Sequence, residues 1–254
     1  MPSLKLACTS PGVAEIFRSI QGEGPNSGRL RTFVRLSGCN LQCAWCDTPY
    51  TWNWHGTPWP HVADGPDAPS KFDPARESVE LSVDEVAERV AQLPAEGVVI
   101  TGGEPLVQMR ALTALIERLR EQAPSRLVEI ETNGTLAPSA ALAGLVDLFM
   151  VSPKLENAGN RPGAAIRARA LAAFAELPTA AFKLVAATPD DVNEAARLAA
   201  TLGIEPTRVY IMPLGTDSGT LNRIGASIIG AVIDNGFNYS DRLHVHLFGD
   251  TRGT

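Results

Sequence analysis

Three cysteines with close, unequal spacing stand out as the residues best suited to chemistry. Cys39, Cys43 and Cys46 are separated by three and two residues, and the remaining cysteine, Cys8, lies far from them in the sequence. A structural zinc site usually closes with a fourth protein ligand and draws on two separated pairs. A cubane iron–sulfur cluster held by three thiolates instead keeps one iron open for a non-protein ligand. The spacing therefore favours a 4Fe-4S cluster.

Two other interpretations of the thiols stay open at this point. The loop could be an isolated zinc knuckle completed by Cys8, His55 or His61, or the three thiols could be buried without any common ligand. Three cysteines in eight positions directly after a predicted strand are rarely accidental, which places the cluster ahead of both alternatives.

Three further polar segments follow predicted strands. Residues 101–105 read Thr-Gly-Gly-Glu-Pro, residues 131–134 read Glu-Thr-Asn-Gly, and residues 152–154 read Ser-Pro-Lys. Two adjacent glycines allow a close approach of the backbone to a ligand, and Glu104 could accept hydrogen bonds from an ammonium group. The alternatives are a plain turn at each site and a solvated amine at Lys154.

The elements that must position these segments alternate between strand and helix. Strands are predicted at Thr32 to Leu36, Val98 to Thr101, Leu127 to Glu131, Leu148 to Val151, Ala181 to Val185 and Val209 to Met212. Helical patterns occupy Ser82 to Leu93, Leu106 to Gln122, Ser139 to Leu145, Ala164 to Leu177, Pro189 to Leu202 and Thr220 to Asn235. This alternation predicts an α/β fold of parallel βαβ units, either open or curling towards a barrel, with ligands at the carboxyl ends of the strands.

Three local features refine this architecture. Ser82 and Glu85 form a capping box at the start of the first helix. Residues 243–248 alternate in polarity and predict one more strand, with His244 and His246 on one face as a possible metal pair or as hydrogen-bonded strand residues. An irregular insertion at about residues 51–80, rich in Pro and Trp, is expected to be a lid or a surface excursion with its own small aromatic core.

The composition is that of an ordinary globular protein. Among 254 residues, 44% are hydrophobic, and 22 basic against 28 acidic residues give a net charge of −6. This argues against disorder and against binding to nucleic acid or anionic membrane through the overall field. No apolar run is long enough to span a membrane, and no secretory signal is recognisable. We expect a cytoplasmic protein with one domain over residues 1–254.

The cysteine loop, with an aromatic residue before its last Cys, resembles that of the radical S-adenosylmethionine superfamily. The resemblance implies a partial (β/α)6 TIM-like barrel and a 4Fe-4S cluster on Cys39, Cys43 and Cys46. It also implies that S-adenosylmethionine chelates the open iron and is cleaved reductively to a 5′-deoxyadenosyl radical. Residues 101–105 resemble the motif that binds the methionine amino group. The cofactor-binding residues implied are Gly103, Glu104, Ser152, Pro153 and Lys154.

Four segments narrow the resemblance: residues 16–25, 33–35, 46–48 and 243–254 together are similar to the 7-carboxy-7-deazaguanine synthase family over nearly the whole chain. That family contracts the ring of 6-carboxy-5,6,7,8-tetrahydropterin with loss of ammonia, on the route to queuosine and other 7-deazapurines. The resemblance implies catalytic roles for Glu23, Arg35 and Glu131. The substrate-binding residues implied are Ile20, Gln21, Gly22, Glu23, Arg35, Thr101 and Thr254.

Chemistry supports several of these roles. An amide and a carboxylate, Gln21 and Glu23, suit the guanine-like edge of a pterin, and Arg35 can hold a carboxylate bidentately. The resemblance makes Thr48 a ligand of Mg²⁺, although a Thr after an Asp is also a helix cap. One departure is Met212-Pro213, where relatives commonly carry Gln-Pro, so the cofactor contact there is in doubt.

The resemblance also implies partners and leaves rivals. It implies a reductant protein such as flavodoxin or ferredoxin, a small-molecule pterin substrate, a homodimer, and neither nucleic acid nor membrane as a partner. The alternatives are a radical S-adenosylmethionine activating enzyme that acts on a protein and a zinc-stabilised binding module without enzymatic activity.

Overall fold

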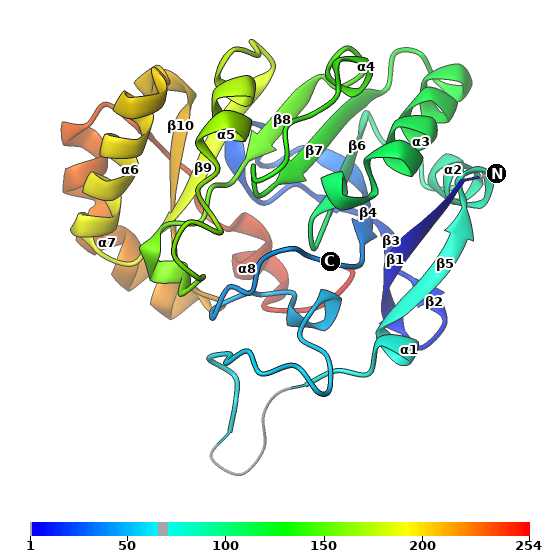
Figure 1. Ribbon diagram of the computed structural model, residues 1–254, viewed down its shortest axis with the longest axis horizontal. Coiled ribbons are helices and arrows are strands. Elements are labelled where there is room, and N and C mark those ends of the chain that lie inside the picture. The colour runs from blue at the N-terminus through cyan, green and yellow to red at the C-terminus, as the bar shows by residue number, and fades with distance from the viewer. Residues whose placement is uncertain (1, 66–70) are drawn as a thin grey trace.

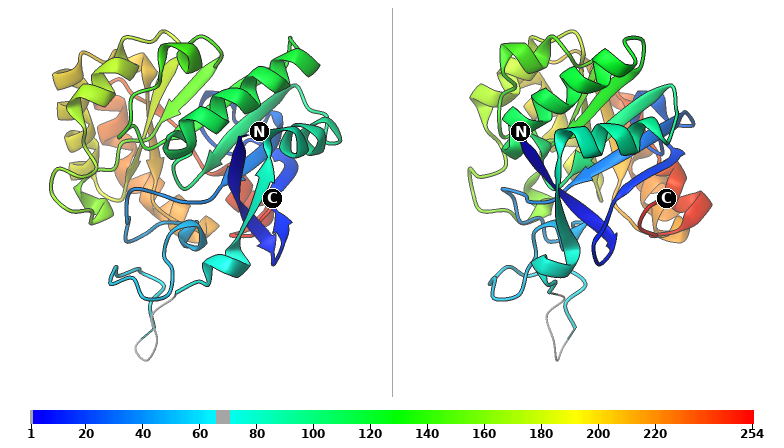
Figure 2. Two further views of the ribbon diagram at one scale, coloured as in Figure 1. Left: turned by 45° about the vertical axis from the view of Figure 1, so that its right-hand side comes forward. Right: turned by 90° about the vertical axis from the view of Figure 1, so that its right-hand side faces the viewer.

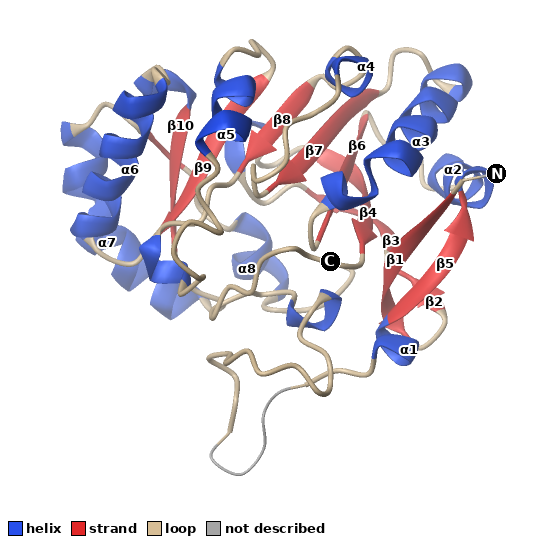
Figure 3. Cartoon of the chain, viewed as in Figure 1, coloured by secondary structure: helices blue, strands red, loops and turns tan. Residues whose placement is uncertain are grey.

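The computed structural model describes residues 2–65 and 71–254, and its centre is a largely parallel sheet (Figures 1 and 3). All six predicted strands are present and neighbour one another in chain order, and short β11 (Asn238–Tyr239) pairs with the last of them. The six are β4 (Leu30–Leu36), β6 (Gly97–Gly102), β7 (Leu127–Thr132), β8 (Leu148–Val151), β9 (Ala180–Ala186) and β10 (Val209–Pro213). The prediction of an α/β fold with a partial barrel is confirmed.

Amphipathic helices cover the outer face of this sheet (Figure 2). They are α2 (Val83–Ala91), α3 (Met109–Gln122), α4 (Ala140–Ala143), α5 (Ala168–Ala175), α6 (Pro189–Leu202) and α7 (Ser218–Asp234). Helix α3 buries Leu112, Leu115 and Leu119 at helical spacing against the strands, as expected for an apolar stripe. The capping box of Ser82 and Glu85 is present at the start of α2.

Four N-terminal strands extend the sheet beyond the predicted core. These are β1 (Ser3–Ser10), β2 (Val13–Ala14), β3 (Ile16–Ile20) and β5 (Ser78–Ser82). Both β1 and β3 run antiparallel to β4, with Leu6 opposite Leu36 and Ile16 opposite Val34. These strands were not predicted, because they carry polar and charged residues between short apolar ones and long-range pairing decides their conformation.

The prediction of a strand at residues 243–248 is wrong, because this segment is helix α8 (Leu243–Phe248). The sheet edge that the segment could have joined, alongside β10, is already taken by β11. Arg242, which precedes the helix as its N-cap, and Val245 within it are buried, whereas His246 is bonded to Asp241. His244 and His246 therefore share no strand face and form no metal pair.

The predicted insertion is irregular where the structure describes it, apart from a short 3-10 turn at Pro49–Thr51, helix α1 (Pro74–Glu77) and the first residues of β5. Residues 66–70, which are part of this prediction, lie outside the described residues. The aromatic side chains pack locally, with Tyr50 edge-on to Phe72 and Lys5 over Trp54. Among the described residues no helix is long and apolar enough to cross a bilayer. A single domain over 1–254 remains a prediction.

Candidate active site

A deep pocket opens at the carboxyl ends of the parallel strands and is lined by fifteen of the seventeen predicted site residues. In Figure 1 the arrows of β7, β8 and β9 point towards the half of the molecule that holds this pocket. The lining residues include Ile20, Gln21, Gly22, Glu23, Arg35, Cys39, Cys43, Cys46, Thr48, Thr101, Gly103, Glu131, Ser152, Lys154 and Thr254. Glu104 and Pro153 are buried beside the pocket and do not line it.

The cysteine loop is held in place by the segment after β8. The backbone N–H of Ala44 donates to the carbonyl of Ala158 at 2.9 Å, that of Gln42 to Asn160 Oδ1 at 2.9 Å, and Trp45 Nε1 to the carbonyl of Asn157 at 2.9 Å. The Trp45 side chain thus helps to pack the two loops together, and it also lines the pocket. These hydrogen bonds hold the loop with the three thiols at the carboxyl ends of the parallel strands.

The surroundings of the thiols suit an iron–sulfur cluster. Cys43 packs in a small apolar cluster with Leu41 and Ala158, and Asn160 Nδ2 donates to Cys43 Sγ at 3.1 Å. Such N–H bonds to sulfur and the low polarity are among the features that tune clusters. Burial raises the pKa of Cys39 to about 12 and that of Cys46 to about 11, so these free thiols are protonated at neutral pH.

Two of the side chains proposed to complete a zinc knuckle are accounted for otherwise, namely those of His61 and Cys8. His61 Nε2 lies 2.8 Å from the carbonyl of Cys46, while its Nδ1 accepts the N–H of Ala63 at 3.1 Å. Cys8 is fully buried in β1, paired with β2. Within the described ranges, no three His, Cys, Asp or Glu side chains are close enough to hold a single metal ion.

The loop after β6 packs directly on the cysteine loop. An added Cβ on Gly103 would lie 2.2 Å from the carbonyl oxygen of Gly38, so the glycine permits contact between two backbones. Glu104 is fully buried, and its carboxylate accepts the N–H groups of Leu106 and Asn133 at 2.9 and 2.6 Å and the Thr132 hydroxyl at 2.8 Å. The side chain of Glu104 therefore holds two loops together.

On the next strands, polar groups face the thiols. Lys154 Nζ donates to Ser152 Oγ at 2.7 Å and lies 5.8 Å from the centre of the Trp45 ring. Asn133 Nδ2 bonds Asn40 Oδ1 at 2.9 Å and lies 4.0 Å from Cys39 Sγ. A cation and an amide are thus placed beside the cysteine loop, where they fit a ligand that carries a carboxylate.

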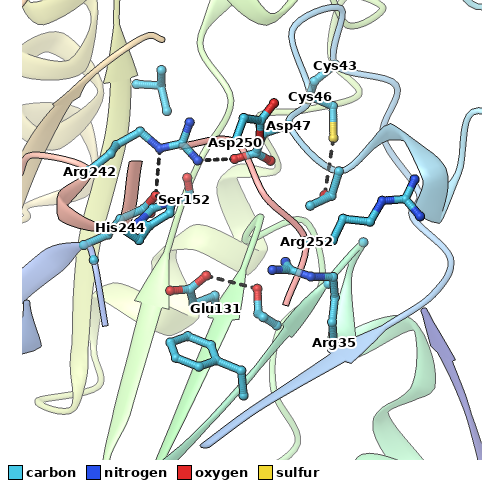
Figure 4. Close-up of a pocket in the computed structure, with 18 of the residues that line it drawn as sticks. Arg35, Cys43, Cys46, Asp47, Glu131, Ser152, Arg242, His244, Asp250 and Arg252 are labelled. Carbon is cyan, nitrogen blue, oxygen red and sulfur yellow. Dashed lines mark hydrogen bonds and ion pairs between the residues drawn. The ribbon is translucent and has the colours of Figure 1, made fainter. Parts of the chain in front are cut away.

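An ionic network forms the opposite wall of the pocket. The Glu23 carboxylate pairs with Lys183 and, at 3.0 Å, with Arg242 Nε, and Arg242 also pairs with Asp47 (Figure 4). Burial alone would raise the pKa of Glu23, but the charges of Lys183 and Arg242 outweigh it and hold this pKa well below the usual range. Glu23 is therefore ionised at neutral pH.

Glu131 joins this wall to the β6 strand end. Its carboxylate accepts the Thr101 hydroxyl at 3.0 Å and Gln21 Nε2 at 3.3 Å, and lies 4.0 Å from Lys183 Nζ. Burial would lower the pKa of Lys183, but Glu131 and Glu23 together raise it, so Lys183 stays protonated. One preorganised array of donors and acceptors is thus formed by the side chains of Gln21, Glu23, Thr101, Glu131 and Lys183.

The N-terminal segment and the C-terminal tail close the pocket from one side. Helix α8 contacts the Gln-Gly-Glu-Gly segment, since Leu243 N–H donates to the Gly22 carbonyl at 2.9 Å and a Cβ on Gly22 would lie 1.9 Å from His244 Nδ1. Burial lowers the pKa of His244, so its ring is neutral at pH 7. In the view of Figure 4, Arg35 and Arg252 lie on the side opposite Arg242 and His244.

Several residues of the site were not assigned a role from the sequence. Lys183 is only 6% exposed within the otherwise apolar strand β9, and a lone Lys in such a run was a usable signal. Arg242 and Asp47 carried no local signal, because their partners are distant in the sequence.

Comparisons with known proteins agree with this geometry. A family described as a 4Fe-4S single cluster domain matches residues 20–167. A 7-carboxy-7-deazaguanine synthase of Pyrobaculum aerophilum is 37% identical over 95% of this chain and 96% of its own length. One of Rhodopirellula baltica is 32% identical over 95% and 88%, respectively.

A solved structure leads to the same family. The crystal structure of QueE from Escherichia coli superposes with a TM-score of 0.65 at 25% identity, covering 94% of this chain and 95% of that one. The cofactors are accordingly a 4Fe-4S cluster and S-adenosylmethionine, and the three thiols and the groups around them fit both. The chain belongs to the 7-carboxy-7-deazaguanine synthase family of radical S-adenosylmethionine enzymes.

Proposed function

We propose that this pocket converts 6-carboxy-5,6,7,8-tetrahydropterin to 7-carboxy-7-deazaguanine with loss of ammonia, a step of queuosine and 7-deazapurine biosynthesis. The observation that carries the proposal is that one pocket brings the cysteine loop together with Gln21, Glu23 and Arg35. The names of the relatives support the same reaction. Cys39, Cys43 and Cys46 hold the cluster, which with S-adenosylmethionine supplies a carbon radical for hydrogen abstraction.

The chain's own residues bind and orient the two small molecules. Lys154 and Ser152 hold the carboxylate end of S-adenosylmethionine, and the backbone at Gly103, which lines the pocket, receives its amino group. Glu104 and Pro153 act behind the pocket as supports. All five predicted cofactor-binding residues thus keep a role, and the role of Glu104 and Pro153 is indirect.

Ionised Glu23 and the Gln21 amide read the polar edge of the pterin, and Thr101 and Ile20 complete that side. The guanidinium of Arg35 holds the substrate carboxylate. Glu131, next to protonated Lys183, is placed to exchange a proton with the ring that loses ammonia. Catalytic roles fall to Glu23, Arg35 and Glu131.

A magnesium ion beside the substrate carboxylate is part of the proposal. Thr48 lines the pocket two residues after Cys46, with its hydroxyl 3.7 Å from Cys46 Sγ, and a hydroxyl oxygen is a hard ligand suited to Mg²⁺. Thr254 also lines the pocket, which supports its predicted contact with the substrate.

The remaining parts concern partners and location. We propose that a cytoplasmic reductant protein such as flavodoxin or ferredoxin supplies the electron, that the enzyme is a homodimer, and that neither nucleic acid nor membrane takes part. The acidic net charge of −6 supports the last point.

An anaerobic turnover assay tests the reaction. Reconstituted enzyme receives the pterin, S-adenosylmethionine, Mg²⁺ and dithionite, and 7-carboxy-7-deazaguanine, ammonia and 5′-deoxyadenosine are quantified. We expect 7-carboxy-7-deazaguanine and ammonia in equal amounts, because the ring contraction is redox-neutral, and neither product from Cys43→Ala. Formation of 5′-deoxyadenosine without the deazapurine would contradict the proposed substrate.

A further inference from the structure

A fully buried carboxylate, Glu15, lies behind the pocket wall and is not explained by the functions assigned so far. It sits between β2 and β3, and its backbone is tied on both sides. Its N–H donates to the carbonyl of Ala7 at 2.7 Å, and its own carbonyl accepts the N–H of Arg35 at 3.1 Å. The backbone of Glu15 is therefore held by two strands, β1 and β4.

Both oxygens of Glu15 hold residues that line the pocket. Arg35 Nε donates to Oε1 at 2.7 Å, and the Tyr50 hydroxyl donates to Oε2 at 2.9 Å. A guanidinium has five N–H groups, and use of Nε leaves those on the two Nη atoms for a bidentate bond to a carboxylate. The bond to Glu15 thus leaves the two Nη atoms of Arg35 for the pocket, where Arg35 is 19% exposed.

Tyr50 extends this arrangement to the C-terminal tail. The guanidinium carbon of Arg252 lies 3.6 Å from the centre of the Tyr50 ring, a cation–π contact, and Arg252 Nη1 pairs with Glu77 at 2.6 Å. Arg252 lines the pocket two residues before Thr254. One buried carboxylate therefore links the carboxylate-binding arginine to the tail that closes the site.

We propose that Glu15 is a positioning residue for substrate binding: it orients Arg35 towards the pterin carboxylate and, through Tyr50, seats Arg252 and the tail. This inference rests on the proposed function of Arg35. The N-terminal strands lie outside the parallel core. By holding Glu15, they set the geometry of one substrate contact.

The test is Glu15→Gln, with pterin and S-adenosylmethionine titrated separately into reconstituted enzyme. A glutamine has one acceptor oxygen for two donors, so one of the two bonds is lost. Loss of a bond to a charged group weakens pterin affinity by about 10- to 100-fold. The KM for the pterin rises by the same factor with kcat at saturating pterin little changed, because Arg35 binds substrate and transition state alike. S-adenosylmethionine affinity and iron content stay at the wild-type level.

Two further variants separate positioning from folding. Tyr50→Phe removes one hydrogen bond but keeps the ring under Arg252, and we expect a loss of pterin affinity of about 3- to 10-fold. Glu129→Gln is the matched control, since Glu129 is an equally buried partner of Arg31 at 2.5 Å and neither residue lines the pocket. It should lower stability without changing pterin affinity.

A double variant decides whether Glu15 acts through Arg35. In an Arg35→Ala background, Glu15→Gln should cause no further loss beyond the small share that passes through Tyr50. A full additional loss, an unchanged affinity of Glu15→Gln, or equal losses for both ligands would each overturn the inference. A wild-type enzyme that does not bind the pterin would instead overturn the proposed function, so the two failures are distinguishable.

Discussion

Replacing Glu23 by glutamine is the most informative single perturbation of the ionic wall. The change keeps the size of the side chain and removes its charge. In the structure the carboxylate pairs with Lys183 and with Arg242, which are 6% and 9% exposed, and Glu23 itself is 11% exposed. Two nearly buried cations thus lose a shared anion.

The remaining partners limit the cost of this loss. Removing one member of a buried ion pair typically costs about 3–5 kcal/mol when the other charge is left alone. Here Lys183 keeps Glu131 at 4.0 Å, and Arg242 keeps Asp47. We therefore expect a loss in the free energy of unfolding of about 2–3 kcal/mol, closer to that of hydrogen bonds to charged groups.

The same substitution also alters the surface offered to the pterin. An amide presents a donor where an N–H of the ring requires an acceptor, and such a mismatch costs about 1–3 kcal/mol. Pterin affinity should therefore weaken by roughly 10- to 100-fold, while S-adenosylmethionine affinity and iron content stay unchanged.

Denaturant unfolding of the cluster-free protein measures the loss in the free energy of unfolding. Separate titrations of the pterin and S-adenosylmethionine measure the loss of affinity for each ligand. Glu96→Gln is the control, because Glu96 pairs with Arg31 at the surface and is 60% exposed. Equal pterin affinity, or an equal loss for both ligands, would refute the role of Glu23 as the pterin acceptor.

The pH dependence supplies an independent check. The pKa of Glu23 in the folded protein is held below its value of about 4.3 in the unfolded chain. Its stabilising contribution is then complete above that value and is lost as the pH falls through the folded-state pKa. The stability difference between wild type and Glu23→Gln should be constant from pH 6 to 8 and shrink below about pH 4.

Three other predictions concern the cofactors. Cys39→Ala, Cys43→Ala and Cys46→Ala should each abolish cluster assembly, whereas Cys8→Ala, in β1, should not; iron and sulfide counts on the four variants decide this. Thr48→Ala should reduce the benefit of added Mg²⁺ but leave reductive cleavage of S-adenosylmethionine intact, and an unchanged metal response would return Thr48 to a purely structural role. Gly103→Ala should cost about 1–3 kcal/mol and lower the iron content, because its Cβ would meet the Gly38 carbonyl at 2.2 Å. Gly144→Ala is its control, since the nearest atom there lies 3.7 Å away; wild-type iron content in Gly103→Ala would count against the contact.

The parallel core and the place of the cysteine loop at its strand ends were readable from the sequence. Strands such as Leu148–Val151 and helices such as Pro189–Leu202 appear with the predicted bounds, since each is a local pattern of buried side chains bounded by turn residues. The spacing of Cys39, Cys43 and Cys46 indicated the cofactor because their ligand chemistry depends on residues close together in the chain. Short-range information is sufficient for features of this kind.

Other features needed the tertiary structure. The segment at residues 243–248 alternates in polarity as a strand does, yet it is helical because β11 already occupies the sheet edge. The pairing of Glu23 with Lys183 and Arg242 joins residues 160 and 219 positions apart. Glu104 turns inward because the Asn133 N–H and the Thr132 hydroxyl, at the end of another strand, meet it there. No local pattern encodes these contacts. They arise only when the folded sheet brings its strand ends together, which removes water and leaves each buried charge dependent on a distant partner.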